Sequence, residues 1–390
     1  MDSPNRWRLH TGAPCPPCSL WLLALIAALG GCGGNSTIRI NTLGPVSTGA
    51  TISFTFVANF NAGNVSAFSL DASGNLSPIP GSPFGAGAGS EFMAVDSIHH
   101  FLFVSNQGAS TLSGFSINTG TGVLSPLAGS PFATGATPHG VAIDPAGKFV
   151  FVGNQDDNSV SVFHIDSVSG LLTPVPGSPF SGIETPFGIA LDVTGAFLYV
   201  SNINTNAVSA FRVDPSTGAL TPLRSFATGE TPIGMIADPN GKFLYVGNHM
   251  DSSVTAYGID PASGALTPVN GQPASSSGCT VSCHLNPLRL AIDPTNKFAF
   301  VANVGADSIS AFALGSGSLS PMSSVTTGQH PFGLAFDPSG RFLYVVNKLD
   351  DNISGFSMDP VTGMLTPLSG SPFPAGENTA PTGIVIVAKQ

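Results

Sequence analysis

Short apolar runs alternate with turns rich in Gly, Pro, Asn and Asp along most of the 390-residue chain. Residues 140–144 form one such run, and residues 149–153 form the next, which is apolar nearly throughout, as expected of a strand buried on both faces. Residues 159–165 alternate between polar and apolar side chains, which is typical of a half-buried strand. A fourth run begins near Leu172 and contains Pro174. Because proline cannot donate to a sheet ladder, this last strand must lie at an edge, and the pattern predicts a four-stranded antiparallel sheet.

This unit repeats seven times. The motif Phe-x-(Phe/Tyr)-Val-x-Asn begins at positions 54, 101, 149, 197, 243, 298 and 342. A second motif, Gly-x-Leu-(Ser/Thr)-Pro, recurs in phase with it, beginning at positions 74, 122, 170, 218, 264, 317 and 363. Seven four-stranded units with a proline-bearing outer edge predict an all-β fold, the seven-bladed β-propeller, with four antiparallel strands per blade.

The sequence also predicts how the ring closes. The first unit begins at its second strand, residues 54–58, with no clear apolar strand just before it. The chain ends with residues 382–387, which match the innermost strand of the other units. We therefore expect the C-terminal strand to join the first blade, which then takes three strands from the N-terminal part of the propeller and one from the C-terminus.

The composition agrees with this architecture. Charged residues make up only 9% of the chain, against roughly 25% in an ordinary soluble domain, while the chain has 47 Gly and 33 Pro. This scarcity of charged helix formers argues against a helical bundle. The net charge of −10 argues against nucleic acid as a partner, because there is no excess of Lys and Arg to displace counterions from phosphate.

The first residues have the features of an export signal. Arg6 and Arg8 precede an apolar run at residues 19–29, which is too short to span a bilayer. The sequence Leu29-Gly30-Gly31-Cys32 resembles the lipobox of bacterial lipoproteins. The resemblance implies a signal peptide at residues 1–31, lipidation at Cys32, a linker at residues 32–53 and a propeller at residues 54–390. It implies a bacterial envelope protein held to a membrane by its lipid, on the periplasmic or cell-surface side. An uncleaved anchor or an ordinary signal peptide is the alternative.

Two cysteines remain in the predicted folded domain. Cys279 and Cys283 are an even pair in an exported protein, which favours one local disulfide. His284 follows at once and suggests metal or haem as the alternative, but haem attachment requires two residues between the cysteines and here there are three. The surrounding unit is also the longest of the seven.

The repeats resemble a known family. The strings Tyr199-Val-Ser-Asn202, Tyr245-Val-Gly-Asn248 and Tyr344-Val-Val-Asn347 are similar to YVTN-type repeats. The unit as a whole resembles the seven-bladed lactonase family that includes 6-phosphogluconolactonase, and the resemblance covers residues 54–390. It implies a lactone-hydrolysing activity, although function resides in sites rather than in a fold.

The family's motif residues are only partly present. Pro138-His139 matches a Pro-His that precedes an inner strand in the family. The family's Gly-Pro-Arg-His reads Asn286-Pro287-Leu288-Arg289 here, so that Arg stands one place late and His is absent. The family's Glu after the next Asn is replaced by Val304. The resemblance therefore leaves His139 and Arg289 as candidate catalytic residues, for a general base and for the stabilisation of an oxyanion.

Other polar residues are predicted on the same face of the ring, around the mouth of the central channel. Loops that enter the inner strands and loops that join second to third strands both emerge there. They carry His249, His284, His330, Lys348, Glu184, Glu230, Asp156, Asp157, Asp251, Asp307, Asp350 and Asp351. The carboxylates suggest a Ca²⁺ site, but Asp is also a good turn residue. No His-x-His spacing supports zinc. We expect no metal and no other cofactor, with Ca²⁺ as the alternative. His99 and His100 fall in a turn on the opposite face.

Two functions follow from the sequence. The first is a monomeric, envelope-anchored propeller without catalytic activity, which binds a small molecule or an envelope protein through the channel mouth. The second is a lactone (carboxylic ester) hydrolase that resembles 6-phosphogluconolactonase. The incomplete motif favours the first.

Overall fold

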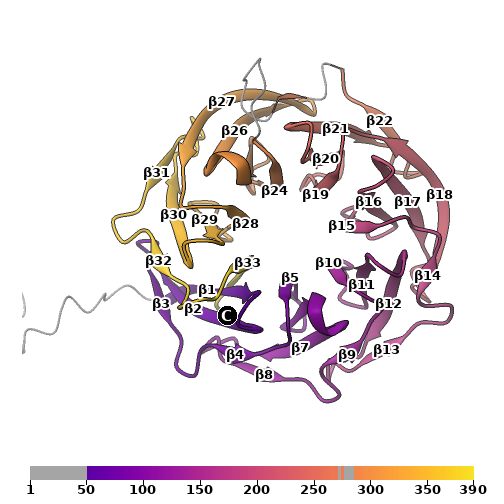
Figure 1. Ribbon diagram of the computed structural model, residues 1–390, viewed down its shortest axis with the longest axis horizontal. Helices are drawn as coiled ribbons and strands as arrows, with labels where there is room; N and C mark the ends of the chain where they lie inside the picture. Colours follow the sequence, from indigo (N-terminus) through magenta and orange to yellow (C-terminus); the bar gives the residue numbers. More distant parts are fainter. Residues whose placement is uncertain (1–50, 271–273, 276–284) are drawn as a thin grey trace, which may run out of the picture. The chain divides into compact units, whose positions relative to one another are not determined.

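The computed structural model describes residues 51–270, 274–275 and 285–390, which form seven antiparallel sheets around a central channel (Figure 1). Each sheet is one blade of a β-propeller, as the repeats predict. The inner strands, given in the order of blades 1 to 7, are β33 (Pro381–Ala388), β5 (Ser90–Asp96), β10 (Pro138–Ile143), β15 (Pro186–Leu191), β19 (Pro232–Ala237), β24 (Pro287–Ile292) and β28 (Pro331–Phe336). The lists of the other strands below follow the same order. Each inner strand contacts that of the next blade, and β28 contacts β33, so the ring is closed.

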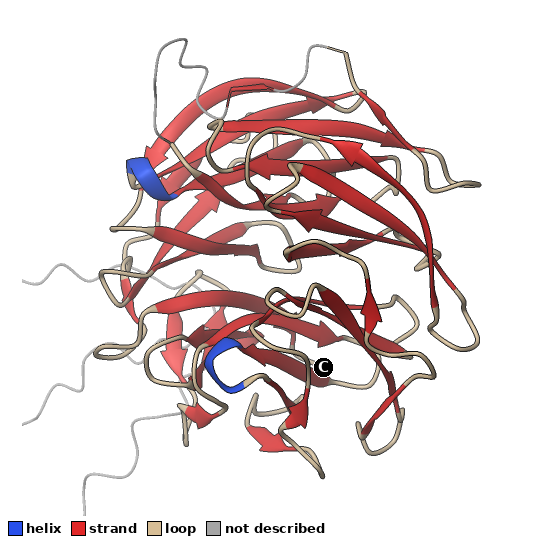
Figure 2. Cartoon of the chain, turned by 45° about the vertical axis from the view of Figure 1, so that its right-hand side comes forward, coloured by secondary structure: helices blue, strands red, loops and turns tan. Residues whose placement is uncertain are grey.

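The second and third strands form the middle of each blade. The second strands are β1 (Thr51–Asn59), β6 (Phe101–Asn106), β11 (Phe149–Asn154), β16 (Phe197–Asn202), β20 (Phe243–Asn248), β25 (Phe298–Asn303) and β29 (Phe342–Asn347). The third strands are β2 (Asn64–Asp71), β7 (Thr111–Ile117), β12 (Ser159–Ile165), β17 (Ala207–Val213), β21 (Ser253–Ile259), β26 (Ser308–Gly315) and β30 (Asn352–Met358). Only two single-turn 3₁₀ helices, η1 (Gln107–Ala109) and η2 (Val304–Ala306), interrupt the strands of the described residues (Figure 2).

Each blade has the four strands that the sequence predicts, and five blades carry one more short strand at the outer edge. The outer strands are β3 (Leu76–Pro78), β8 (Leu124–Pro126), β13 (Leu172–Pro174), β18 (Leu220–Ala227), β22 (Leu266–Pro268), β27 (Ser318–Thr326) and β31 (Leu365–Pro367). Five blades add a two-residue strand that also pairs with the third strand: β4 (Phe84–Gly85), β9 (Phe132–Ala133), β14 (Phe180–Ser181), β23 (Ala274–Ser275) and β32 (Phe373–Pro374). In four of these blades the sequence Gly-Ser-Pro lies between the two segments, directly before the Phe that begins the second. In the two blades that have no such two-residue strand, β18 and β27 run on without a break.

The C-terminal strand closes the ring as predicted. Strand β33 pairs antiparallel with β1, with Phe54 opposite Val387 and Ala58 opposite Gly383. The first blade is therefore ordered β3-β2-β1-β33. Thr382 reinforces the junction, since its hydroxyl lies 3.3 Å from the carbonyl oxygen of Ala58 in its own blade and 3.2 Å from that of Ser90 in the next.

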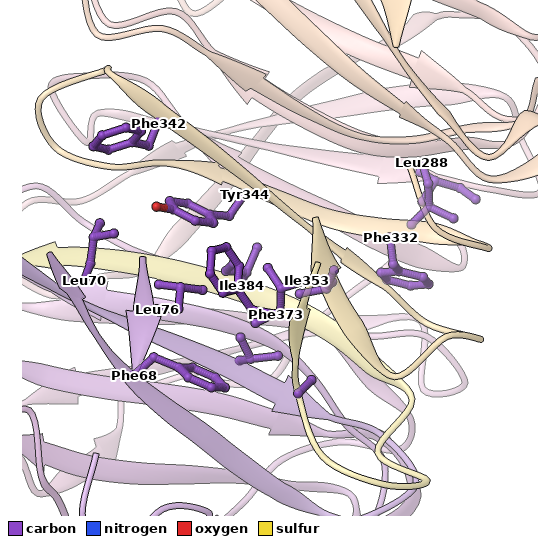
Figure 3. Packing of buried hydrophobic residues seen from close by; sticks show 14 residues of the cluster. Phe68, Leu70, Leu76, Leu288, Phe332, Phe342, Tyr344, Ile353, Phe373 and Ile384 are labelled. Carbon is purple, nitrogen blue, oxygen red and sulfur yellow. The ribbon is translucent and has the colours of Figure 1, made fainter. Parts of the chain in front are cut away.

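The two repeated sequence motifs meet between adjacent blades. Each motif glycine has a positive φ and lies against the first Phe of the motif in the preceding blade, so that a Cβ on Gly122 would stand 2.5 Å from Phe54. Gly74 makes the same contact with Phe342 and joins the first blade to the seventh. Figure 3 shows the apolar cluster at this junction, where Phe342 and Tyr344 lie near Leu70 of the first blade. The cores of the propeller thus lie between its blades.

The seven motif asparagines have a structural role. All are buried, and each donates its side-chain amide to one or two side chains at the start of the third strand. Asn154 Nδ2, for example, lies 3.0 Å from Ser159 Oγ and 2.8 Å from Ser161 Oγ. These bonds fix the turn between second and third strands, which forms part of the channel mouth. Within the described residues, no helix is long and apolar enough to span a bilayer.

Candidate functional site

Each inner strand begins at the channel mouth in the same way. The residue before the strand has a left-handed backbone in all seven blades, and its carbonyl oxygen accepts a hydrogen bond from the residue after the motif Asn. In blade 3 this bond joins Gln155 N to Thr137 O over 3.0 Å. The second residue of each inner strand therefore lies just inside the mouth. In blades 1 to 7 these residues are Thr382, Glu91, His139, Phe187, Ile233, Leu288 and Phe332. The residues after the motif Asn are Phe60, Gln107, Gln155, Ile203, His249, Val304 and Lys348.

His139 and Glu91 form a buried pair between blades 2 and 3. Glu91 Oε2 lies 2.7 Å from His139 Nδ1, and the two residues are only 5% and 3% exposed. Phe187 of blade 4 stacks on the imidazole, with 4.1 Å between ring centroids. The ring is therefore held by a hydrogen bond at its edge and by an aromatic ring on its face.

The other imidazole nitrogen contacts two carboxamides. His139 Nε2 lies 2.8 Å from Gln155 Oε1 and 3.4 Å from Gln107 Nε2. When Nδ1–H donates to Glu91, a neutral ring leaves Nε2 as an acceptor, for which Gln107 supplies a donor. A protonated ring instead donates from Nε2, for which Gln155 supplies an acceptor. Nε2 thus has a hydrogen-bond partner whether it donates or accepts.

Arg289 lies in the same part of the channel. Its guanidinium carbon stands 3.7 Å from the centroid of the Phe92 ring, and the same Phe92 ring packs edge-on against His139 at 6.0 Å. The Arg289 Nε is buried without a hydrogen-bond partner among the described residues. Burial lowers the pKa of Arg289 to about 10, partly opposed by the negative charge of Glu91. Arg289 is therefore a cation at neutral pH without an ion-pair partner among these residues, which suits an anionic ligand or a developing oxyanion.

Phe92 and Arg289 both break a rule of the repeat. The third residue of the inner strand is glycine in the other five blades, because a Cβ there would meet the backbone of the next blade. At Gly188 the Cβ would lie 2.2 Å from the carbonyl oxygen of Ile233. Blades 2 and 6 carry large side chains at this position instead, and these two side chains contact each other.

A second polar group lies at the mouth in blades 5 to 7. His249 Nε2 accepts a hydrogen bond from Asn286 Nδ2 over 3.0 Å, and burial lowers the pKa of His249. Burial also lowers the pKa of His330, and the positive charge of Lys348 adds to this effect. Lys348 Nζ lies 4.7 Å above the Phe60 ring and 5.2 Å from that of Phe332. His249, His330 and Lys348, which the sequence predicts at the mouth, thus lie together.

The aspartates predicted at the channel mouth accept hydrogen bonds from neighbouring loops. Asp251 accepts a hydrogen bond from Glu230 N over 2.6 Å, and Asp350 accepts one from Gln329 N over 2.8 Å. Asp307 accepts one from His330 N, and Asp156 accepts one from the hydroxyl of Thr137. Each carboxylate thus joins a turn between second and third strands to a loop that enters an inner strand. No three His, Cys, Asp or Glu side chains are close enough to hold a metal ion in the part of the chain that the structure describes. Cys32, Cys279, Cys283 and His284 lie outside the described residues.

Sequence reasoning did not select Glu91, Phe92, Gln107 or Gln155. A signal for Glu91 was nevertheless present, since it stands fifteen residues before Asn106, just as His139 stands fifteen residues before Asn154. Aligning the repeats on the motif Asn would have placed both side chains at the same level of the ring. Their contact depends on the packing of adjacent blades.

The comparisons with known proteins agree with this fold. The structure is similar to a putative 6-phosphogluconolactonase from Bacteroides fragilis, with 21% identity and a TM-score of 0.75, over 87% of this chain and 99% of that one. It is also similar to a periplasmic gluconolactonase from Pseudomonas aeruginosa, with 18% identity and a TM-score of 0.74, over 87% of this chain and 100% of that one. No curated protein sequence matches the chain significantly. The family model described as "Lactonase, 7-bladed beta-propeller" matches residues 77–185, 174–283 and 287–380, which together span well over half of the chain. The chain therefore belongs to the seven-bladed β-propeller lactonase family.

Proposed function

We propose that this protein hydrolyses a lactone, or a similar carboxylic ester, at the channel mouth. The observation that carries the proposal is the buried Glu91–His139 pair, which lies in the same part of the channel as the guanidinium of Arg289. Ester hydrolysis needs a base to activate water and a positive group to stabilise the oxyanion. The family motif at residues 286–289 and Val304 does not supply a second His or a Glu, but Glu91 provides a carboxylate from another blade.

The geometry suggests a sequence of proton transfers. His139 Nε2 removes a proton from water, and the resulting hydroxide attacks the lactone carbonyl carbon. The carbonyl oxygen becomes an oxyanion, which Arg289 stabilises, while Glu91 stabilises the imidazolium that has formed. The tetrahedral intermediate then collapses, the ring C–O bond breaks, and the imidazolium returns its proton to the leaving alkoxide. One lactone and one water thus yield one hydroxy acid, and the enzyme ends in its starting state.

A second candidate is binding without turnover. It is favoured by the bond between His139 Nε2 and Gln155, because a water that attacks a substrate would have to displace this carboxamide. In that case Arg289 and Lys348 would hold an anionic ligand at the mouth, and the predicted partners, a small molecule or an envelope protein, would bind there.

The test is an assay of the purified full chain against glucono-1,5-lactone and a panel of other lactones, with acid release followed in a pH-stat. We expect turnover above the spontaneous rate, and a loss of at least about 10²-fold in His139→Gln. His164→Gln is the matched control, since His164 is exposed on the third strand of the same blade. A folded wild-type protein without turnover that binds a lactone would favour the second candidate. Turnover unaffected by His139→Gln would contradict the mechanism.

The predicted export supports a reaction at the cell envelope, where the lipid on Cys32 would retain the enzyme. Metabolic labelling with palmitate in a bacterial host is expected to mark the wild type and not Cys32→Ala. Labelling of both proteins would show that the lipid is attached elsewhere.

A further inference from the structure

The end of the channel opposite the mouth has a gap in its ring of turns. In blades 2 to 7 a tight turn joins the inner strand to the second strand, and several of these turns pack against the turn of the preceding blade. A Cβ on Gly195 would lie 2.8 Å from Pro145, and one on Gly340 would lie 2.9 Å from Pro294. The first blade has no such turn, because its inner strand β33 and its second strand β1 come from opposite ends of the propeller. The ring of turns is therefore interrupted between Pro338 of blade 7 and Ser97 of blade 2.

A cavity of about 500 Å³ occupies this gap. Its lining is mainly apolar and includes Phe54, Val95, Phe336 and Ile384. A volume of several hundred Å³ is typical of sites for small organic ligands. The cavity is lined by the ends of inner strands that lie far from the mouth, so it is separate from the site of Glu91 and His139.

Three polar side chains of blade 2 line one side of the cavity: Ser97, His100 and Thr119. None of the three side chains has a hydrogen bond to another of the described residues. Blade 2 departs from the repeat here, since the turn that reads Asp144-Pro-Ala-Gly-Lys148 in blade 3 reads Asp96-Ser-Ile-His-His100. The imidazole and the two hydroxyls can all donate a hydrogen bond, whereas no Asp or Glu side chain is among the residues that line the cavity.

We propose that this cavity is a binding site for a small amphipathic carboxylic acid. The apolar body of the ligand lies against Phe54, Phe336 and Ile384, and the carboxylate accepts hydrogen bonds from His100, Ser97 and Thr119. A head group that only accepts hydrogen bonds can use all three unbonded donors, and no Asp or Glu side chain of the lining repels it. The site does not depend on lactone hydrolysis.

Calorimetric titration of the full chain with decanoate, below its micelle concentration, tests the proposal. We expect saturable binding of one decanoate per chain. Ala388→Trp should abolish it, because Ala388 lines the cavity on an exposed part of β33, where a large side chain fills the space without disturbing a buried core. His100→Leu should weaken decanoate binding about tenfold and decanol binding less, since a hydrogen bond to a charged group contributes more than one to a neutral group.

Lys148→Leu is the matched control for His100→Leu, because Lys148 is the equivalent residue of blade 3 and does not line the cavity. It should bind decanoate like the wild type. Thermal unfolding of every variant checks that the fold is intact. Absence of saturable binding to the wild type would overturn the proposal, and so would unchanged binding in a folded Ala388→Trp. Lactone turnover is measured in parallel and should be the same in all these variants, so failure here is distinct from failure of the proposed hydrolysis.

Discussion

Glu91 Oε2 lies 2.7 Å from His139 Nδ1, although the two residues belong to different blades and are 48 positions apart in the chain. The pair is buried, and the repeat places both residues at the same level of adjacent inner strands. A buried carboxylate beside an imidazole fixes the orientation and the tautomer of the ring. The contact between blades thus holds the imidazole of His139 in one orientation at the channel mouth.

Glu91→Gln should lower lactone turnover by about 10²- to 10³-fold with little change in KM, because the imidazolium formed in the reaction loses its counter-charge. Steady-state kinetics at several pH values checks this. Glu184→Gln removes an exposed glutamate from the same face and should have no effect. Equal losses in both variants would mean that general surface charge, rather than the pair with His139, supports activity.

Arg289→Met should abolish turnover without lowering the melting temperature. The buried Nε of Arg289 has no hydrogen-bond partner among the described residues, so an apolar side chain of similar length removes an unfavourable burial while it keeps the contact with Phe92. Arg224→Met is the control, since Arg224 lies 4.9 Å over Phe226 on the exposed outer strand of blade 4. A large fall in melting temperature for Arg289→Met would show that the guanidinium is structural.

The protein should lose stability as the pH falls below about 6.5. Burial holds the pKa of His249 and His330 below the ordinary value of 6.5, so at lower pH the unfolded chain binds protons that the folded chain does not. The free energy of unfolding therefore decreases with acidification, while these two groups cause no change above that range. Urea unfolding at pH 5 and pH 8 should show a smaller difference in the double variant His249→Gln, His330→Gln than in the wild type. An equal difference in both proteins would assign the acid sensitivity to other groups.

Gly317→Ala should destabilise the propeller by about 2–4 kcal/mol, through backbone strain and overpacking. Gly317 has a φ of +85°, and a Cβ there would lie 2.1 Å from Phe243 of the preceding blade. Gly182 also has a φ of +85° but no atom within 4 Å of such a Cβ, so Gly182→Ala measures the backbone strain alone. The difference between the two variants in chemical unfolding isolates the contact between blades. Equal destabilisation would show that Phe243 moves aside at no cost.

Deletion of residues 383–390 should prevent cooperative folding. These residues include most of β33, which is the inner strand of the first blade and contacts the inner strands on both sides. Without it, β1 becomes an exposed edge and the ring stays open. Circular dichroism during thermal unfolding is the measurement, and a truncated protein that melts like the full chain would contradict the role of β33.

The sequence by itself determined the architecture and the closure of the ring. Seven copies of two motifs define the blades, and the unpaired strand at residues 382–387 identifies the partner of β1, because strand patterns and turn residues are local properties that a repeat displays many times. His139 and Arg289 were also accessible from the sequence, through a motif that resembles the family's.

Only the tertiary structure decided what these residues contact. Glu91 was not selected as a site residue, because its partner His139 lies in the next blade and their distance depends on how the blades pack around the channel. The meeting of Arg289 with Phe92 has the same origin, since it requires two side chains at positions that other blades fill with glycine. The cavity beside Ser97 and His100 exists because the first blade is built from both ends of the propeller and lacks one turn. Contacts between blades set these features, and no single repeat contains the information that fixes them.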